Sequence, residues 1–401
     1  MGVCWKKPPK NPSFARHCAI GAMAAPLWSR TLALTTKRLL ARPRCSTTAA
    51  QATPPPSPQP CGLTSQPLSH KVSIEETIAW RAHAIQKAQT ACDAAVTAED
   101  FRRELDWLLE DAIDGWKDAA ALASSPFMAM PTATSRLTVA ELDEMWKRRV
   151  DERVPLQYLT NEAHWGDFVL EVGPGVLIPR PETEELARLC VAAVKRERAL
   201  FDGPWCDAGT GSGALALALC AERRRLYAEQ EDVTSDPRVF ATDVSEDAAG
   251  FARRNARRLG LSECNDGNGD SSTPAVHVLV GPWLAPLPAE VREGKLALLV
   301  SNPPYIPLHG DASTLQLEVG RHEPMLALDG GGADGADAIR ALTKEAAHAL
   351  RSGGLYALET NAGEQAHELA DMMRSDDNTW RDVSVECDLE GRNRFVLAWR
   401  R

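Results

Sequence analysis

The amino-acid sequence predicts an α/β protein in which a doubly wound, mainly parallel sheet follows a small helical bundle and a β-hairpin connector. Helical patterns fill residues 73–152, short alternating runs with Gly and Pro fill 153–182, and strands alternate with helices in 183–401. The expected strands cover residues 205–208, 239–242, 276–280, 296–300, 356–359 and 394–399. Ligands of such sheets bind at the carboxyl ends of the strands, so the residues that follow these strands are the first candidates for a site.

The helical segment carries its own start signal and apolar faces. Ser73 can cap a helix whose first turn holds Glu75 and Glu76. Apolar residues then recur at helical spacing in two stretches: Phe101, Leu105, Leu108, Leu109 and Ala112, followed by Leu142, Met145 and Trp146. We therefore expect helices without strands here, with Trp107, Trp116 and Trp146 in core packing.

The first 72 residues differ in charge from the rest of the chain. Ten of the 45 Lys and Arg precede Glu75, while none of the 55 Asp and Glu do, which leaves 35 basic against 55 acidic residues from there on. An acid-free start with Arg, Ser and Thr predicts a mitochondrial (matrix) targeting sequence, with a disordered tail or a secretory signal as alternatives. Residues 53–60 are Pro-rich and predict an extended linker.

Composition excludes several classes of function. No apolar stretch reaches the roughly 18 residues that span a bilayer. The ten cysteines are scattered without CxxC pairs, so we expect no metal site and no disulfide framework. The acidic body weighs against direct contact with nucleic acid and favours a basic protein partner.

A glycine-rich loop follows the first expected strand and precedes a helix rich in Ala and Leu. Glycines let the backbone approach a ligand, and a helix N-terminus offers free N–H groups. Asp243 ends the next strand and can accept bonds from two ribose hydroxyls. Both a nicotinamide dinucleotide and an adenosyl group fit this pattern. The loop residues expected to contact the cofactor are Asp207, Gly209, Thr210, Gly211, Ser212 and Gly213.

The tetrapeptide Asn302-Pro303-Pro304-Tyr305 ends the apolar run 296–300. Proline has no N–H and a fixed φ, so the turn is rigid and its carbonyls are free to face a ligand. The Asn302 side-chain oxygen and the Pro303 carbonyl can accept both hydrogens of a planar –NH2 group while a flat group stacks near Tyr305. This arrangement favours N-methylation, with Asn302, Pro303 and Tyr305 as catalytic candidates. An ordinary strand-to-loop turn is the alternative.

With these motifs the chain resembles, over about residues 75–401, the class I S-adenosylmethionine-dependent methyltransferases that modify a glutamine side-chain amide in peptide-chain release factors. The likeness also includes 154–159 (VPLQYL), 177–184 (LIPRPETE) and 323–328 (EPMLAL). Two positions depart from the family pattern: Pro282 before Trp283, and the sequence Glu359-Thr360-Asn361, which leaves the role of Glu359 open.

The resemblance implies a Rossmann-like fold and S-adenosylmethionine as cofactor, bound by the glycine loop, Asp243, Trp283 near the adenine, and Asn302. It also implies that residues 302–305 hold the glutamine of a Gly-Gly-Gln motif. An N6-adenine methyltransferase for DNA or RNA is the alternative, because an exocyclic amine presents the same two hydrogens.

Arg180 and Glu182 are expected to line the mouth of the site, because the resemblance places their segment next to the cofactor. Capping of the helix that starts near Thr183 is the other interpretation. We expect the helical domain and the hairpin connector to dock a release factor, and the protein to act as a monomer away from membranes.

Overall fold

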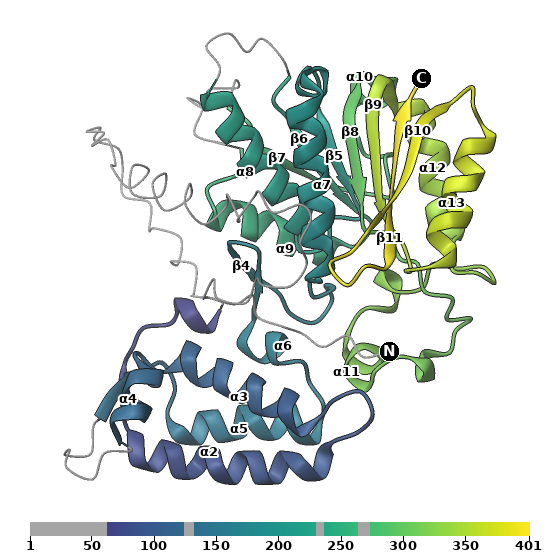
Figure 1. The fold of residues 1–401 in the computed structure, drawn as a ribbon. Helices are drawn as coiled ribbons and strands as arrows, with labels where there is room; N and C mark the ends of the chain where they lie inside the picture. The colour runs from purple at the N-terminus through teal and green to yellow at the C-terminus, as the bar shows by residue number, and fades with distance from the viewer. Residues whose placement is uncertain (1–61, 124–131, 230–235, 264–272) are drawn as a thin grey trace, which may run out of the picture.

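The computed structural model describes residues 62–123, 132–229, 236–263 and 273–401 (Figure 1). The predicted targeting sequence up to residue 61, including the Pro-rich linker, lies outside this part of the chain. The described residues form a helical region, a hairpin connector and a larger α/β region (Figure 1). None of the described helices is both long and apolar enough to cross a membrane.

The helical region is built on the capping signals of the sequence. The Ser73 hydroxyl accepts a hydrogen bond from the Glu76 N–H, and Thr138 forms a capping box with Glu141. Its core includes the fully buried Phe101 and Trp146. Its helices are α2 (Ile74–Ala88), η2 (Gln89–Ala91), α3 (Ala98–Ala112), α4 (Trp116–Ala123) and α5 (Val139–Asp151).

Two details of this region differ from the expectation. Strands β1 (His70–Ser73) and β2 (Thr132–Ser135) pair antiparallel where only helices were expected. The folded region also begins before residue 73, because η1 (Leu63–Ser65) places Leu63 in the helical core. The helical region therefore begins before residue 72, the predicted end of the targeting sequence and linker.

The connector contains a short helix and a hairpin. Helix α6 (Leu156–Thr160) ends at Asn161, whose φ of 55° is left-handed, as is common at helix C-termini. Strands β3 (Glu162–Trp165) and β4 (Phe168–Glu171) then pair antiparallel. The chain continues through residues 172–181 into helix α7 (Glu182–Arg196), which is followed by η3 (Arg198–Phe201).

The α/β region is organised around a seven-stranded sheet with the order β10-β11-β9-β8-β5-β6-β7. Strand β5 pairs parallel with β6 and β8, and β11 is antiparallel to both of its neighbours. The strands are β5 (Trp205–Ala208), β6 (Val239–Asp243), β7 (Val276–Val280), β8 (Leu296–Ser301), β9 (Leu350–Glu359), β10 (Trp380–Cys387) and β11 (Asn393–Arg400).

Helices cover both faces of the sheet, as a doubly wound fold requires. One face packs against α7, α8 (Ala214–Ala228) and α9 (Glu246–Arg258). The other face packs against α10 (Ala289–Arg292), α12 (Asp337–Ala349) and α13 (Glu364–Ser375). Alternate residues of the strands enter the two cores, as Phe395 and Val396 do on β11. The predicted doubly wound sheet is confirmed.

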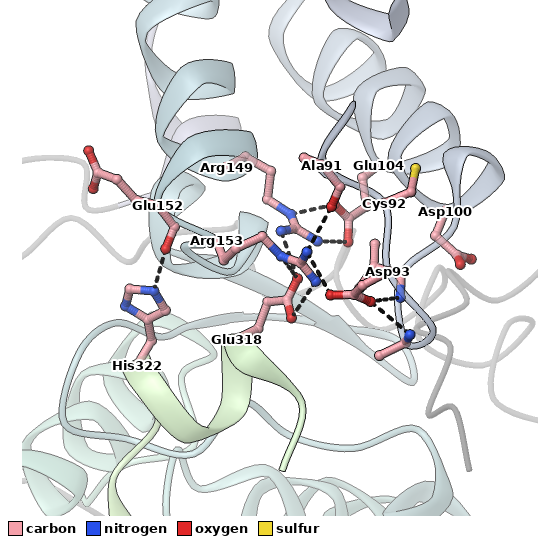
Figure 2. A network of polar contacts seen from close by, with 12 residues as sticks. Ala91, Cys92, Asp93, Asp100, Glu104, Arg149, Glu152, Arg153, Glu318 and His322 are labelled. Atoms are coloured by element: carbon pink, nitrogen blue, oxygen red, sulfur yellow. Dashed lines mark hydrogen bonds and ion pairs between the residues drawn. The ribbon is translucent and has the colours of Figure 1, made fainter. Parts of the chain in front are cut away.

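The segment between β8 and α12 reaches the helical region. It contains η4 (Ala312–Thr314), α11 (Leu317–His322) and η5 (Met325–Ala327), and α11 lies beside the helices in Figure 1. Glu318 of α11 accepts hydrogen bonds from two guanidinium groups, those of Arg149 and Arg153. Arg149 also bonds Glu104 on α3, and His322 contacts the Glu152 carbonyl (Figure 2).

This ion cluster is buried between the two regions. The Arg149 side chain is 2% exposed and the Glu318 side chain 10%. Buried charges are tolerated only when they are paired, so the pairs fix how the helical region sits against the α/β region.

Glu318→Ala should destabilise the protein, because it removes the carboxylate that two buried guanidinium groups share and leaves Arg149 only Glu104 and Arg153 only Asp93 as acidic partners. We expect the free energy of unfolding to fall by about 3–5 kcal/mol in urea denaturation followed by Trp fluorescence. Asp151→Ala breaks the exposed Lys87–Asp151 pair and is the matched control, with an expected loss of at most about 1 kcal/mol. Equally small losses in both variants would contradict this role for the cluster.

Candidate active site

A cavity of about 310 Å³ lies at the carboxyl ends of β5, β6 and β8. It is lined by residues 175–177, 179–180, 183, 209–212, 214–215, 243–245, 248, 282–283, 302, 304, 324 and 326–327. The segments come from the connector, the starts of α7, α8 and α9, the chain after β5, β6, β7 and β8, and the segment that carries α11. The structure therefore brings together motifs that are far apart in the sequence.

The glycine loop forms one wall of this cavity. Gly209, Gly211 and Gly213 all have positive φ, between 57° and 91°. A Cβ on Gly213 would lie 3.3 Å from the Ala252 Cα on α9, so a larger residue there would meet both backbone strain and crowding. Gly209, Thr210, Gly211 and Ser212 line the cavity, whereas Gly213 lies behind them.

Asp207 does not line the cavity, but its hydrogen bonds anchor the glycine loop. Its carboxylate accepts hydrogen bonds from the Thr210 hydroxyl at 2.6 Å and from the Ala216 N–H, in the first turn of α8, at 3.0 Å. Asp207 thus takes the place of the missing capping side chain at Gly213. Burial raises the pKa of Asp207 to about 7.

Asp243 lines the cavity and also braces the glycine loop. One carboxylate oxygen accepts from the Gly211 N–H and the other from the Ser245 N–H, both at 2.9 Å. Burial raises the pKa of Asp243, and these backbone bonds oppose the rise. A carboxylate oxygen has a second lone pair, so Asp243 can still accept from ligand hydroxyls.

Trp283 lines the cavity beside Gly209 of the glycine loop. It has a φ of 43° and its ring edge approaches Gly209: a Cβ built there would lie 3.7 Å from Trp283 Cζ3. Pro282 lines the same wall. The flat indole gives the cavity an aromatic surface for a planar ligand group.

The turn at 302–305 supplies a hydrogen-bond acceptor at the cavity edge. Asn302 and Pro304 line the cavity, and Asn302 Nδ2 donates to the Thr183 hydroxyl at 3.1 Å. Among the residues that the structure describes, none donates a hydrogen bond to Asn302 Oδ1 or to the Pro303 carbonyl oxygen. Asn302 Oδ1 is therefore available to a ligand in the cavity, whereas Pro303 is not among the residues that line it.

Tyr305 and Pro303 have a different setting from the one expected. Pro303 is buried, and neither Pro303 nor Tyr305 is among the residues that line the cavity. The Tyr305 hydroxyl donates to Glu359 at 3.3 Å, and burial raises its pKa. The Tyr305 hydroxyl thus has a partner at the end of β9, and the stacking of a substrate group near Tyr305 stays a prediction.

Arg180 and Glu182 take different directions. Arg180 lines the cavity and pairs with Glu323 at 2.8 Å, and the second Glu323 oxygen accepts from the Ile178 N–H. Two of the motifs in the sequence therefore join beside the cavity. Glu182, at the start of α7, lies away from it and comes within 3.8 Å of Arg392.

Sequence reasoning missed three contributors to this site. Thr183, next to Asn302, was considered only as the start of a helix. Glu359 lies below the turn, and Leu326, which is 62% exposed, forms an apolar part of the cavity wall. Thr183 and Leu326 belong to the quoted motifs 177–184 and 323–328, so the signal was present without a role attached to it.

The similarity of this chain to known proteins shows its family. The chain is 36% identical to the release factor glutamine methyltransferase of Gloeobacter violaceus over 325 residues, which are 80% of this chain and 97% of the relative. This protein belongs to the release factor glutamine methyltransferase family. The release factor glutamine methyltransferase of Synechocystis sp. is 35% identical to this chain over 82% of this chain and 97% of its own length.

The other comparisons add little to this assignment. No family model matches the chain. A solved ribosomal protein L11 methylase from Lactobacillus delbrueckii subsp. bulgaricus is similar over 59% of this chain and 87% of its own, at 16% identity and a TM-score of 0.37. The assignment rests on the curated relatives.

The methyltransferase uses S-adenosylmethionine, as predicted, and has the Rossmann-like fold of its class. The residues present fit this cofactor. Gly209 and Gly211 allow close approach to the backbone, Asp243 can accept from ribose hydroxyls, and Trp283 offers a face for the adenine. The cavity of about 310 Å³ suits a ligand of this kind.

Asp207→Asn should change stability in a pH-dependent way. The pKa of the buried Asp207 is about 7, above the roughly 3.9 of an unfolded Asp. Between these pH values the native state binds more protons than the unfolded state. The Asp207 carboxyl therefore lowers the free energy of unfolding of the wild type as the pH rises. Asn does not titrate, and the melting temperature of the cofactor-free variant relative to wild type should therefore be higher at pH 8 than at pH 5.

Asp334→Asn is the matched control, because its bond with Arg340 lowers the pKa of Asp334 to about 2, below this window. The difference in melting temperature between Asp334→Asn and wild type should be the same at both pH values. A pH-independent difference for Asp207→Asn as well would show that Asp207 does not titrate in this range.

Proposed function

We propose that this methyltransferase transfers a methyl group to the side-chain amide nitrogen (N5) of the glutamine in the Gly-Gly-Gln motif of a release factor. The relatives at 35–36% identity are named for release factor glutamine methylation, which supports this substrate class. The observation that carries the proposal is the Asn302 side chain, which lines the cofactor cavity and whose Oδ1 receives no hydrogen bond from the described residues.

A primary amide is a poor nucleophile because its nitrogen lone pair is delocalised into the carbonyl group. Asn302 Oδ1 and the Pro303 carbonyl each accept one amide hydrogen, which turns the nitrogen toward the cavity. They also stabilise the positive charge that develops on nitrogen during transfer. When bound, S-adenosylmethionine supplies an electrophilic methyl group. Once the nitrogen is methylated it can release a proton, so this mechanism needs no dedicated general base.

The surroundings of the cavity support a protein substrate. Arg180 and Leu326 lie at the cavity, and the helical region sits next to the segment that carries Leu326. A chain with 35 basic and 55 acidic residues from Glu75 on also suits a basic partner. The alternative, methylation of adenine N6 in DNA or RNA, is not favoured, because the relatives are named for glutamine.

Asn302→Ala should abolish methylation while cofactor affinity stays within about tenfold of wild type, because the loss lies mainly in the orientation of the substrate. The measurement is transfer of label from S-adenosylmethionine to a purified release factor, with the labelled residue mapped, and calorimetry for the cofactor. Asn378→Ala, at an exposed position, is the matched control and should be fully active.

Label on a residue other than the Gly-Gly-Gln glutamine in wild type would refute the proposed substrate. Label in added DNA or RNA would revive the alternative. Equal damage to cofactor binding and turnover in Asn302→Ala would refute the role of Asn302.

We further propose that the protein acts in the mitochondrial matrix, supported by the ten basic and no acidic residues before Glu75. Residues 1–72 fused to a fluorescent protein should be imported by isolated mitochondria and become protected from protease. The same fusion with Gln at Arg30, Lys37, Arg38 and Arg42 is the control and should stay outside. Import of neither fusion would argue for another compartment.

A further inference from the structure

A buried carboxyl group lies directly beneath the Asn302 turn. Glu359 ends β9, in the middle of the sheet beside β8, and is 1% exposed. One of its oxygens accepts from the Thr183 hydroxyl at 2.7 Å, and the other accepts from the Tyr305 hydroxyl at 3.3 Å. Three elements, β9, α7 and the turn after β8, therefore meet at one carboxylate.

The hydrogen bonds around this carboxylate have a fixed direction. An ionised carboxylate only accepts, so the single hydroxyl proton of Thr183 must point to Glu359. The Thr183 oxygen can then only accept from Asn302, which must present its Nδ2 group there, at 3.1 Å. The Asn302 amide is planar, so its oxygen lies on the other side and is left for a ligand.

The opposite orientation of Asn302 would be unproductive. It would place an –NH2 group where the substrate amide also presents hydrogens, so two donors would face each other. An asparagine amide is nearly symmetric in shape, and packing alone discriminates poorly between its two orientations. Hydrogen-bond direction is the property that separates them.

We propose that Thr183 and Glu359 are positioning residues that orient the Asn302 side-chain amide so that its oxygen faces the glutamine amide of the substrate. This inference rests on the function proposed above and assigns a role to Glu359. The two residues act through Asn302, and Glu359 does not line the cavity.

The ionisation of Glu359 makes the arrangement sensitive to pH. Burial raises the pKa of Glu359 to about 7. The groups that face this carboxyl are Glu182 on α7, Arg394 on β11 and Tyr305, and Arg180 and Arg394 face Tyr305. When Glu359 is protonated it can donate to Thr183, whose own proton is then free to turn toward Asn302. The direction of the bonds is lost as the pH falls through 7.

The first test replaces the hydroxyl of Thr183. Thr183→Val keeps the shape but removes the bond, and we expect kcat for release factor methylation to fall about 10- to 100-fold. Thr183→Ser keeps the hydroxyl and should recover kcat to within about threefold of wild type. Affinity for S-adenosylhomocysteine, measured by calorimetry, should stay within about threefold in both variants, which also shows that they fold.

The second test removes the titrating group. With saturating cofactor and release factor, kcat of wild type should rise between pH 6 and pH 8. In Glu359→Gln the side chain can accept from or donate to Thr183 at any pH, so kcat at pH 8 should be about tenfold below wild type and should not rise with pH.

The inference is overturned if Thr183→Val keeps wild-type kcat, or if Thr183→Ser is as impaired as Thr183→Val. It is also overturned if either variant loses cofactor affinity as much as kcat, or if Glu359→Gln keeps the wild-type rate and pH profile. Failure of the proposed function is a separate result, because wild type itself would then not methylate the glutamine.

Discussion

The adjacency of three parallel strands is the constraint on which the site depends. Strand β5 pairs with β6 on one side and β8 on the other, in register at Asp207, Ala241 and Val300. All three strands end at the same edge, so the glycine loop, Asp243 and Asn302 arrive together although almost a hundred residues separate the first from the last. The apolar cores on both faces of the sheet keep these strand ends in place. The hydrogen bonds of the polar residues then orient the side chains and the loop at these ends.

Several buried carboxylates then organise the backbone and side chains around the cavity. Asp207 ties the glycine loop to the first turn of α8, Asp243 ties it to β6, and Glu323 joins two distant motifs through Arg180 and Ile178. Burying such groups costs free energy, which shows in the raised pKa values of Asp207 and Asp243. The burial of apolar side chains elsewhere in the fold therefore has to offset the free-energy cost of these buried carboxylates.

Much of this site could be predicted from the sequence because its signals are local. A glycine loop between a strand and a helix, an acid at a strand end and the Asn-Pro-Pro-Tyr turn each carry their meaning within a few residues. Six strands of the seven-stranded sheet followed from the alternation of apolar runs with helical stretches, and β10 was not expected. Strands β1 and β2 were missed because they have four residues each and carry no clear apolar alternation.

Other features depend on tertiary placement and could not be predicted. Glu182 and Thr183 are neighbours at the start of α7, yet one faces Arg392 and the other faces Asn302, and only the direction of the helix decides which. The partnership of Thr183 with Glu359 joins residues 176 positions apart. The sequence likewise has no pattern that pairs Arg149 and Arg153 with Glu318.

The position of α11 has a mechanical consequence. Glu318, which is anchored in the helical region, is only five positions from Glu323, which is anchored beside the cavity. Because both anchors are buried, ordinary salt concentrations screen them only weakly. The two anchors therefore join the helical region to the cavity wall through less than two turns of chain, without any long route through the core.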